Sequence, residues 1–179
     1  SEGLYSVAFA GTEGVGPDLN HPHFLHGLKL WQTHYALRVQ LPTMLVENVQ
    51  IDHAAYGVYR PRFENHVYRN ISIAATGTEP FNRGLDDRSM QHGSITVDGL
   101  AFSKIGYGGN MPLIQISANN LSGKAESHFR KVTVRGRDPK RPGRWPLMNL
   151  GGGPRLKPST PKGVPYFIHD YFGPGKHAK

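Results

Sequence analysis

The stretch LVENVQIDHAAYGVY, residues 45–59, carries the pattern on which the fold prediction depends. Val46 and Val49 enclose a polar pair, and Val49 then alternates with Ile51 as the residues of a strand do. The apolar residues are too closely spaced for a helix face, and the polar pair interrupts the run too early for one ordinary strand. We therefore interpret the stretch as two short strands that meet at a sharp turn.

The same apolar-x-x-apolar-x-apolar pattern recurs along the chain and indicates a repeat protein. It occurs at Leu4-Val7-Phe9, Leu25-Leu28-Leu30, Val46-Val49-Ile51, Tyr68-Ile71-Ile73, Val97-Leu100-Phe102 and Phe129-Val132-Val134. The first members lie 21, 21, 22, 29 and 32 residues apart, and all eighteen positions are apolar in a chain that is only 37% hydrophobic. Units of this length that stack their apolar positions form a solenoid.

The polar pair inside each unit predicts a corner between two strands. Three such pairs are Glu47-Asn48, Arg69-Asn70 and Asp98-Gly99. Asn, Asp and Gly tolerate the left-handed backbone that a sharp corner needs. Successive units would then pair as parallel strands about 4.8 Å apart. Leucine-rich repeats have a similar period, but the Asn and the helix-like return that follow their strand are absent here.

Over roughly residues 4–135 the pattern resembles the right-handed parallel β-helix of the pectate-lyase-like proteins. The resemblance implies an all-β fold, a right-handed parallel β-helix of about six coils. A second apolar motif adds a further wall to the coils. It begins at Tyr35, Tyr56, Leu113 and Leu147. The longer spacings leave insertions around residues 76–92, 104–110 and 117–127, which we expect to emerge as loops, where function often resides.

The residue after the first apolar position of a unit provides a check on the register. In four successive units this residue is Glu47, Arg69, Asp98 and Arg130, so its charge alternates in sign. Opposite charges on neighbouring strands stabilise a sheet by roughly 0.2–1 kcal/mol per pair, and like charges would repel. We interpret the predicted ladder as a stabilising, solvent-exposed face.

The composition changes near residue 136 and predicts two regions. Residues 1–135 hold 12 Lys+Arg and 11 Asp+Glu, whereas residues 136–179 hold 9 and 2, so the second region carries +7 of the net charge of +8. Sixteen of its 44 residues are Gly or Pro, which argues against a regular coil throughout. We expect coils over 1–135 and an irregular basic tail over 136–179. The tail should pack on the coils or on a partner through Tyr166, Phe167 and Tyr171.

Several classes of function are excluded or disfavoured by the sequence. The chain has no Cys, which excludes disulfides, thiolate metal sites and thiol nucleophiles. It has no apolar run near the ~18 residues of a membrane span, no phosphate-binding motif and no recognised nucleic-acid module. It opens with Ser1 and no basic-then-apolar leader. We expect a portion of a larger exported protein, extracellular or periplasmic.

The best candidate binding surface lies around YGVYRPRFENHVYR, residues 56–69. An offset of 21 places Arg38 beside Tyr59, and an offset of 22 brings Asp86 towards Glu64. Arg binds a carboxylate bidentately, and a Tyr ring can lie against a pyranose, so this composition suits an acidic sugar. The candidate residues are Arg38, Tyr56, Tyr59, Arg60, Arg62, Glu64, Asp86, Asp87 and Arg88.

A hard cation such as Ca²⁺ could be held here by the oxygens of Asp86, Asp87 and Glu64. The polysaccharide lyases with the resembling fold use an Arg or Lys as base, and acidic side chains that hold Ca²⁺ near the uronate. No signature in this chain assigns those roles to particular residues, so whether the protein is an enzyme is left open.

Two further clusters are weaker candidates. His21, His23 and His26 have spacings that could bind Zn²⁺ or Cu²⁺, although a surface cluster without metal is our preferred interpretation. Lys29, Trp31, Asp52 and His53 form an outward set in the predicted register. An exposed Trp31 would be a platform for carbohydrate, whereas a Trp31 covered by a loop would be core filler, which we favour.

Two functional hypotheses follow. In the first, the chain binds, and in its stronger form also cleaves, acidic polysaccharide. In the alternative, it is a non-catalytic structural module of a larger protein or assembly, whose tail docks on an acidic protein surface. Both ends of a six-coil stack expose parallel edges, which other chains or further domains would have to cap.

Overall fold

The computed structural model describes residues 5–10, 23–40, 43–59, 65–74, 83–86, 93–104, 113–117, 120, 122–135, 148–150 and 163–173, with the backbone alone for 5–10, 40, 83, 86 and 148–150. The described part is all-β, with no helix long and apolar enough to cross a membrane. Its strands are β1 (Tyr5–Ala10), β2 (His23–His26), β3 (Lys29–Gln40), β4 (Met44–Tyr59), β5 (His66–Ala74), β6 (Arg83–Asp86), β7 (Ile95–Ser103), β8 (Ile114–Ile116), β9 (Ser127–Arg135), β10 (Met148–Leu150), β11 (Tyr166–Ile168) and β12 (Tyr171–Phe172).

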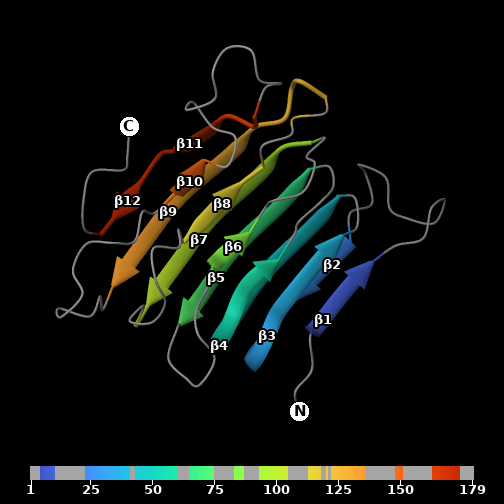
Figure 1. Cartoon of the computed structure of the whole chain (residues 1–179), viewed down its shortest axis with the longest axis vertical. Coiled ribbons are helices and arrows are strands. Elements are labelled where there is room, and N and C mark those ends of the chain that lie inside the picture. Colours follow the sequence, from blue (N-terminus) through green and yellow to red (C-terminus); the bar gives the residue numbers. More distant parts are fainter. Residues whose placement is uncertain are drawn as a thin grey trace.

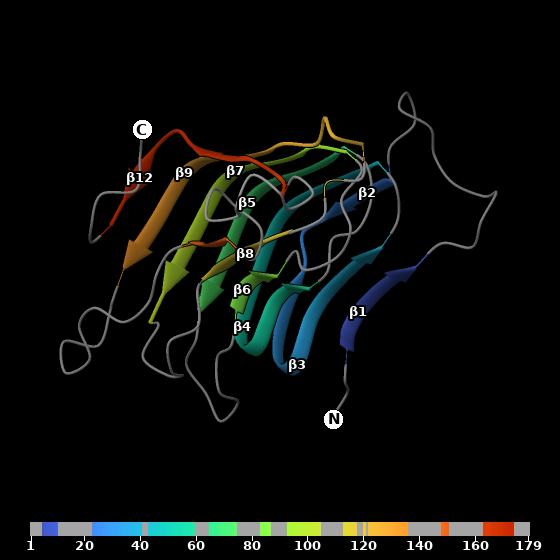
Figure 2. The same cartoon turned by 45° about the horizontal axis from the view of Figure 1, so that its top comes forward.

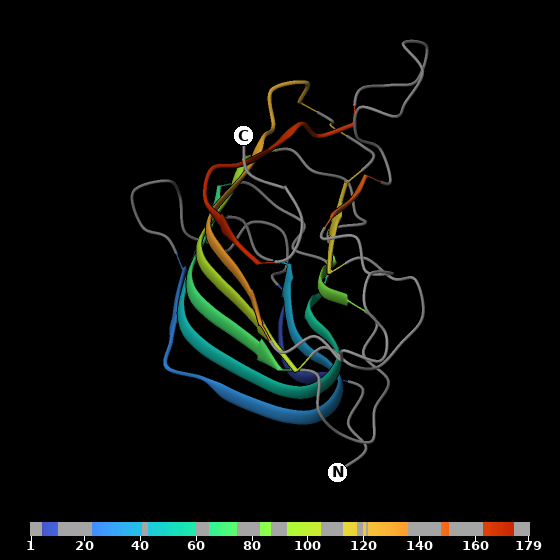
Figure 3. The same cartoon turned by 90° about the vertical axis from the view of Figure 1, so that its left-hand side faces the viewer.

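All twelve strands belong to one parallel sheet. The sheet curls until it is nearly closed, with the strands stacked one above the next (Figures 1 and 3). Strands β3 and β4 are long and sharply bent, so each contributes to more than one side of the curled sheet (Figure 2). As a result β4 pairs with β2 and β3 on one edge, and with β5 and β6 on the other.

Three walls make up the curled sheet. The first wall contains β2, the N-terminal parts of β4, β5, β7 and β9, and β11. The second wall contains the start of β3, the middle of β4, the C-terminal parts of β5, β7 and β9, and β12. The third wall contains β1, the ends of β3 and β4, β6, β8 and β10.

The predicted register of the repeats is confirmed from the Leu25 repeat to the Phe129 repeat. Leu25 pairs with Val46, Val46 with Tyr68, Tyr68 with Val97, and Val97 with Phe129. All apolar positions of the last four repeats are buried, and they form one core with the third wall. In the Leu25 repeat, the first two apolar positions, Leu25 and Leu28, are half-buried and pack against this core.

The predicted corners are also confirmed. In five successive coils one residue has a left-handed backbone between the first and second walls, and these residues are Gly27, Asn48, Asn70, Gly99 and Lys131, with φ between 50° and 83°. Such a φ turns the chain sharply without breaking the pairing on either side, because the coils above and below turn at the same place. A second bend at Gln32 and His53 carries β3 and β4 from the second wall into the third.

The position predicted for the first repeat is wrong. Val7 pairs with Leu37 and Phe9 with Val39, so β1 belongs to the third wall and not beside Leu25. Instead, the first-wall column continues at the other end of the stack, where Ile168 pairs with Phe129. The spacing of 21 residues between the first two units was therefore coincidental, and Leu4 lies outside the described residues.

Two further expectations are corrected by the strands. The insertion at 76–92 was expected to be a loop, but it contains β6, which is a strand of the third wall. The tail was expected to be irregular, but its strands β11 and β12 extend the first and second walls. β8 and β10 continue the wall of the Tyr35 and Tyr56 strands, as predicted for the apolar motifs that begin at Leu113 and Leu147.

The charge ladder has the predicted register but one different ion pair. Glu47, Arg69, Asp98 and Arg130 lie on successive strands of the first wall. Arg69 pairs with Glu47 at 3.0 Å, whereas Asp98 pairs with Lys131 at 3.1 Å. Lys131 has the left-handed backbone of the corner, and its side chain lies next to the Asp98 carboxylate.

Candidate functional site

The predicted Arg–Tyr surface lies on the third wall. Arg38 is in register with Tyr59, as the sequence predicted, and the backbone of Asp86 follows on the other side of Tyr59. Asp86 is thus a direct neighbour of Tyr59. The remaining candidates of this surface lie outside the described residues, and they are Arg60, Arg62, Glu64, Asp87 and Arg88.

The Tyr side chains of this wall pack on each other. Tyr35 lies 4.0 Å from Tyr59 and 4.9 Å from Tyr56 between ring centroids, and the three rings form a cluster separate from the main core. Tyr56 and Tyr59 keep only 8% and 6% of their exposure. Their rings are covered in this structure, so they do not offer an open face on which a pyranose could lie.

An open groove is found instead where the first and second walls meet. This corner groove has a volume of about 350 Å³, within the range of ligand pockets. It crosses three neighbouring coils, because its lining comes from the β2–β3 connection and the start of β3, from β4 and from β5. Its lining residues are Gly27, Leu28, Lys29, Asn48, Val49, Gln50, Asn70 and Ser72.

Amide side chains run along the corner groove in a hydrogen-bonded row. The Asn70 side chain donates to Asn48 Oδ1 at 2.6 Å, and the Asn48 amide nitrogen lies 2.7 Å from His26 Nε2. Gln50 donates to Asp52 at 3.1 Å on the second wall. The row is exposed, so each amide has further hydrogen-bonding capacity towards the groove, since an amide carries two donors and an acceptor oxygen with two lone pairs.

An exposed indole stands beside this groove. Trp31 is 64% exposed and lies in register with Asp52, two residues from Lys29 on the same outward face. The expectation that Trp31 is core filler is therefore wrong. The second wall turns alternate residues outward, and Leu30 takes the buried position. His53 sits at the second bend with a positive φ and is only half-exposed.

The histidines predicted as weak metal ligands do not converge in the described part. His23 and His26 are three residues apart in β2, so they point to opposite faces of the strand, and His26 is engaged by Asn48. His21 lies outside the described residues. Within the described ranges, no group of three or more His, Cys, Asp or Glu residues could hold a metal ion.

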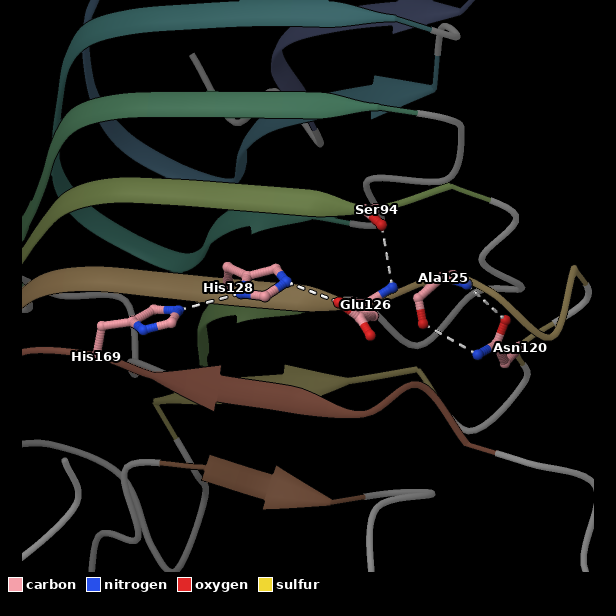
Figure 4. Close-up of polar contacts among 6 residues, drawn as sticks. All are labelled: Ser94, Asn120, Ala125, Glu126, His128 and His169. Atoms are coloured by element: carbon pink, nitrogen blue, oxygen red, sulfur yellow. Dashed lines mark hydrogen bonds and ion pairs between the residues drawn. The ribbon is translucent and has the colours of Figure 1, made fainter. Parts of the chain in front are cut away.

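A polar cluster that the sequence did not reveal lies on the outer face of the first wall (Figure 4). His128 lies between Glu126 and His169, with 3.0 Å from its Nε2 to the Glu126 carboxylate and 3.1 Å from its Nδ1 to His169 Nε2. The backbone N–H of Glu126 donates to Ser94 Oγ at 3.2 Å. These contacts fix the start of β9 against the neighbouring coil.

His128 and His169 are 41 residues apart, and the region between them includes the segment expected to be irregular. The only sequence signal was that IHDYF repeats the apolar-x-x-apolar spacing, with Ile168 and Tyr171 as its apolar members. This spacing places His169 beside β9.

No family model, curated protein or solved structure matches this chain. Its function is therefore inferred from the geometry of its own side chains.

Proposed function

We propose that the curled sheet is a right-handed parallel β-helix. The proposal is supported by the repeated pairing of coils in register and by the column of left-handed residues at one corner. Right-handedness is expected because connections between parallel strands of one sheet are right-handed in nearly all proteins. The six first-wall members of this helix are Leu25, Val46, Tyr68, Val97, Phe129 and Ile168.

We propose further that the chain binds an acidic polysaccharide outside the cell, along the corner groove beside Trp31. The observation that carries this proposal is an open groove that crosses three coils, lined with amides and a Lys and flanked by an exposed indole. An extended chain molecule suits a groove that continues from coil to coil, because polar side chains of three successive coils can contact successive sugar units.

Each part of the groove has a chemical counterpart in a polyuronate. The amides of Asn48 and Asn70 both donate and accept, so they can pair with sugar hydroxyls. Lys29 offers an ammonium to a carboxylate, and such charge-assisted hydrogen bonds are stronger than neutral ones. Trp31 offers an apolar face with a polar N–H at its edge, which suits the C–H face of a pyranose.

Binding of polygalacturonate to the variants Trp31→Ala and Lys29→Gln tests this proposal. We expect each variant to weaken binding at least several-fold in isothermal titration calorimetry, and the Lys29 effect to shrink in high salt because exposed charges are screened. Phe172→Ala is the matched control, since Phe172 is a similarly exposed aromatic residue of the second wall at the far end of the stack. If Trp31→Ala and Lys29→Gln bind polygalacturonate as tightly as Phe172→Ala and the wild type, the groove proposal is refuted.

A second candidate function is supported by the last coil. Phe167 and Phe172 are exposed aromatic side chains on β11 and β12, and within the described ranges these strands pair only with β9. We propose, as the alternative, a structural module that docks a second copy of this chain on this end. Sedimentation of the wild type against Phe172→Ala across a concentration series distinguishes the two, because only a docking role predicts that the variant loses self-association.

A further inference from the structure

The outer face of the first wall holds a pair of imidazoles whose ring nitrogens meet edge to edge. His128 on β9 and His169, which follows β11, have nearly coplanar rings, with 10° between their planes and 5.4 Å between their centroids. The two nitrogens that face each other, His128 Nδ1 and His169 Nε2, are 3.1 Å apart. The two lone-pair directions therefore point at one another across the gap, and in the metal-free chain one proton must lie between them.

Glu126 fixes which nitrogen of His128 is available to this pair. A carboxylate only accepts hydrogen bonds, so neutral His128 carries its proton on Nε2, 3.0 Å from the Glu126 oxygen. Its Nδ1 then presents a lone pair towards His169. The ring of Phe167 stacks on His128, 4.9 Å away between centroids and at 15°, and holds the imidazole in this orientation.

We propose that His128 Nδ1 and His169 Nε2 together bind one divalent first-row transition metal ion, of the Zn²⁺, Ni²⁺ or Cu²⁺ class. With metal–nitrogen bonds of 2.0–2.1 Å, an angle of about 100° at the ion corresponds to nitrogens about 3.1 Å apart, so His169 must turn about His128 but the separation of the two nitrogens need not change. That angle lies between square-planar and tetrahedral geometry. Water completes the coordination, because the site has two protein ligands.

Glu126 is a positioning residue in this site and does not touch the metal. A metal-ligating His almost always donates its other ring N–H to a carboxylate, carbonyl or water, which fixes the tautomer and strengthens the ligand. The Glu126–His128 contact already provides this arrangement. Metal binding replaces the shared proton, and the exposed ring of His169 turns so that its lone pair converges with that of His128.

The charged neighbours set the strength of the site. Arg130 lies two residues after His128 on the same face, is exposed, and opposes a dication. Asp98, its neighbour in register, is held by Lys131. The site should therefore be moderate in affinity, and Arg130→Gln should strengthen it. Bound metal would join β9 to the residue after β11, and so clamp the last coil to the stack.

Calorimetric titration with ZnCl₂ and CuCl₂ alone, in a buffer that does not bind metal, tests the site on the full chain. We expect one ion per chain, tighter binding of Cu²⁺ than of Zn²⁺, and no competition from Mg²⁺ or Ca²⁺, which prefer oxygen ligands. Binding should weaken as the pH falls, because protons compete for the imidazoles.

The variants separate this site from the other histidines of the chain. His169→Ala should abolish the one-site binding, and Glu126→Gln should weaken it about 10–100-fold, as is usual for loss of such a partner. His26→Ala is the matched control, since His26 is an exposed first-wall His bonded to an amide, and it should bind like the wild type. Hydrogen exchange of residues 166–168 should slow with metal in the wild type and in His26→Ala, but not in His169→Ala.

Unchanged binding in His169→Ala, or loss in His26→Ala, would show that the metal binds elsewhere and would overturn the proposal. If Glu126→Gln binds the metal as tightly as the wild type, the Glu126 carboxylate does not position His128 for metal binding. Since His169 is exposed, its replacement leaves the packing of the coil intact, which circular dichroism of the variant confirms or denies.

Discussion

At the scale of single residues, the corner between the first and second walls depends on one left-handed backbone position in each of five successive coils. Asn48 and Asn70 occupy this position in adjacent coils, and their side chains bond to each other at 2.6 Å. Asn serves both purposes, because it tolerates a positive φ and brings an amide that can bond to its neighbour. Gly99 takes the same position in the next coil, where the backbone alone is sufficient.

Replacement of Asn70 separates the two contributions. Asn70→Ala should lower the free energy of unfolding by about 1–2 kcal/mol for the left-handed backbone and by a further ~0.5–1.5 kcal/mol for the lost hydrogen bond. Asn70→Gly loses the hydrogen bond but keeps the backbone unstrained at φ 53°. Urea unfolding should therefore rank wild type above Asn70→Gly above Asn70→Ala, and a reversed order of the two variants would contradict the backbone explanation.

At the scale of the elements, the third wall approaches the second closely where β6 pairs with β4. A Cβ on Gly84 would lie 2.0 Å from Phe102 Cε1, and a Cβ on Gly57 would lie 2.5 Å from the Gly84 carbonyl oxygen. Both glycines are therefore required by close approach. Gly84 leaves room for the large, fully buried ring of Phe102 between the walls, and Gly57 leaves room for the neighbouring strand and for Ile73.

Adding one methyl group at this close contact should overpack the core. Gly84→Ala should destabilise the fold by about 1–3 kcal/mol, because Phe102 must leave its position or the strands must separate. The double variant Gly84→Ala with Phe102→Leu should recover part of the loss, which denaturant unfolding of both proteins would show. A loss in Gly84→Ala that the second change does not relieve would mean that the clash lies with the backbone of Leu113 instead.

At the scale of the whole molecule, residues 163–173 close one end of the stack. Val164 is fully buried and Ile168 nearly so, and both join the main core. Tyr166 and Tyr171 are half-buried against that core, as predicted for two of the anchors, whereas Phe167 is 44% exposed and packs on His128. This segment of the basic region is therefore part of the stack.

Truncation after Lys162 should weaken the whole fold. Burial of an aliphatic side chain contributes about 1.5–3 kcal/mol, so loss of Val164 and Ile168 should cost roughly 3–6 kcal/mol and expose the edge of β9. Thermal unfolding and light scattering would measure the fall in Tm and the aggregation. A truncation after Gly173 keeps these contacts and is the control. An unchanged Tm after the first truncation would contradict the capping role.

The sequence by itself determined the repeat and its corners. Apolar positions at fixed spacing must share one side of the sheet, and Asn or Gly is needed wherever the chain turns left-handed, so the column from Leu25 to Phe129 and the corners at Asn48, Asn70 and Gly99 could be predicted. The adjacency of Arg38 and Tyr59 followed from the same register.

What only the tertiary structure decided concerns contacts between segments that no fixed period connects. Three features depend on which wall packs against which. They are the assignment of β1 to the third wall, the burial of the rings of Tyr56 and Tyr59, and the exposure of Trp31. The meeting of His128 with His169 depends on an insertion of unpredictable path between two coils. Local spacing specifies which residues face inward, but the folded chain decides which distant residues become neighbours, because that choice depends on burial summed over the whole molecule.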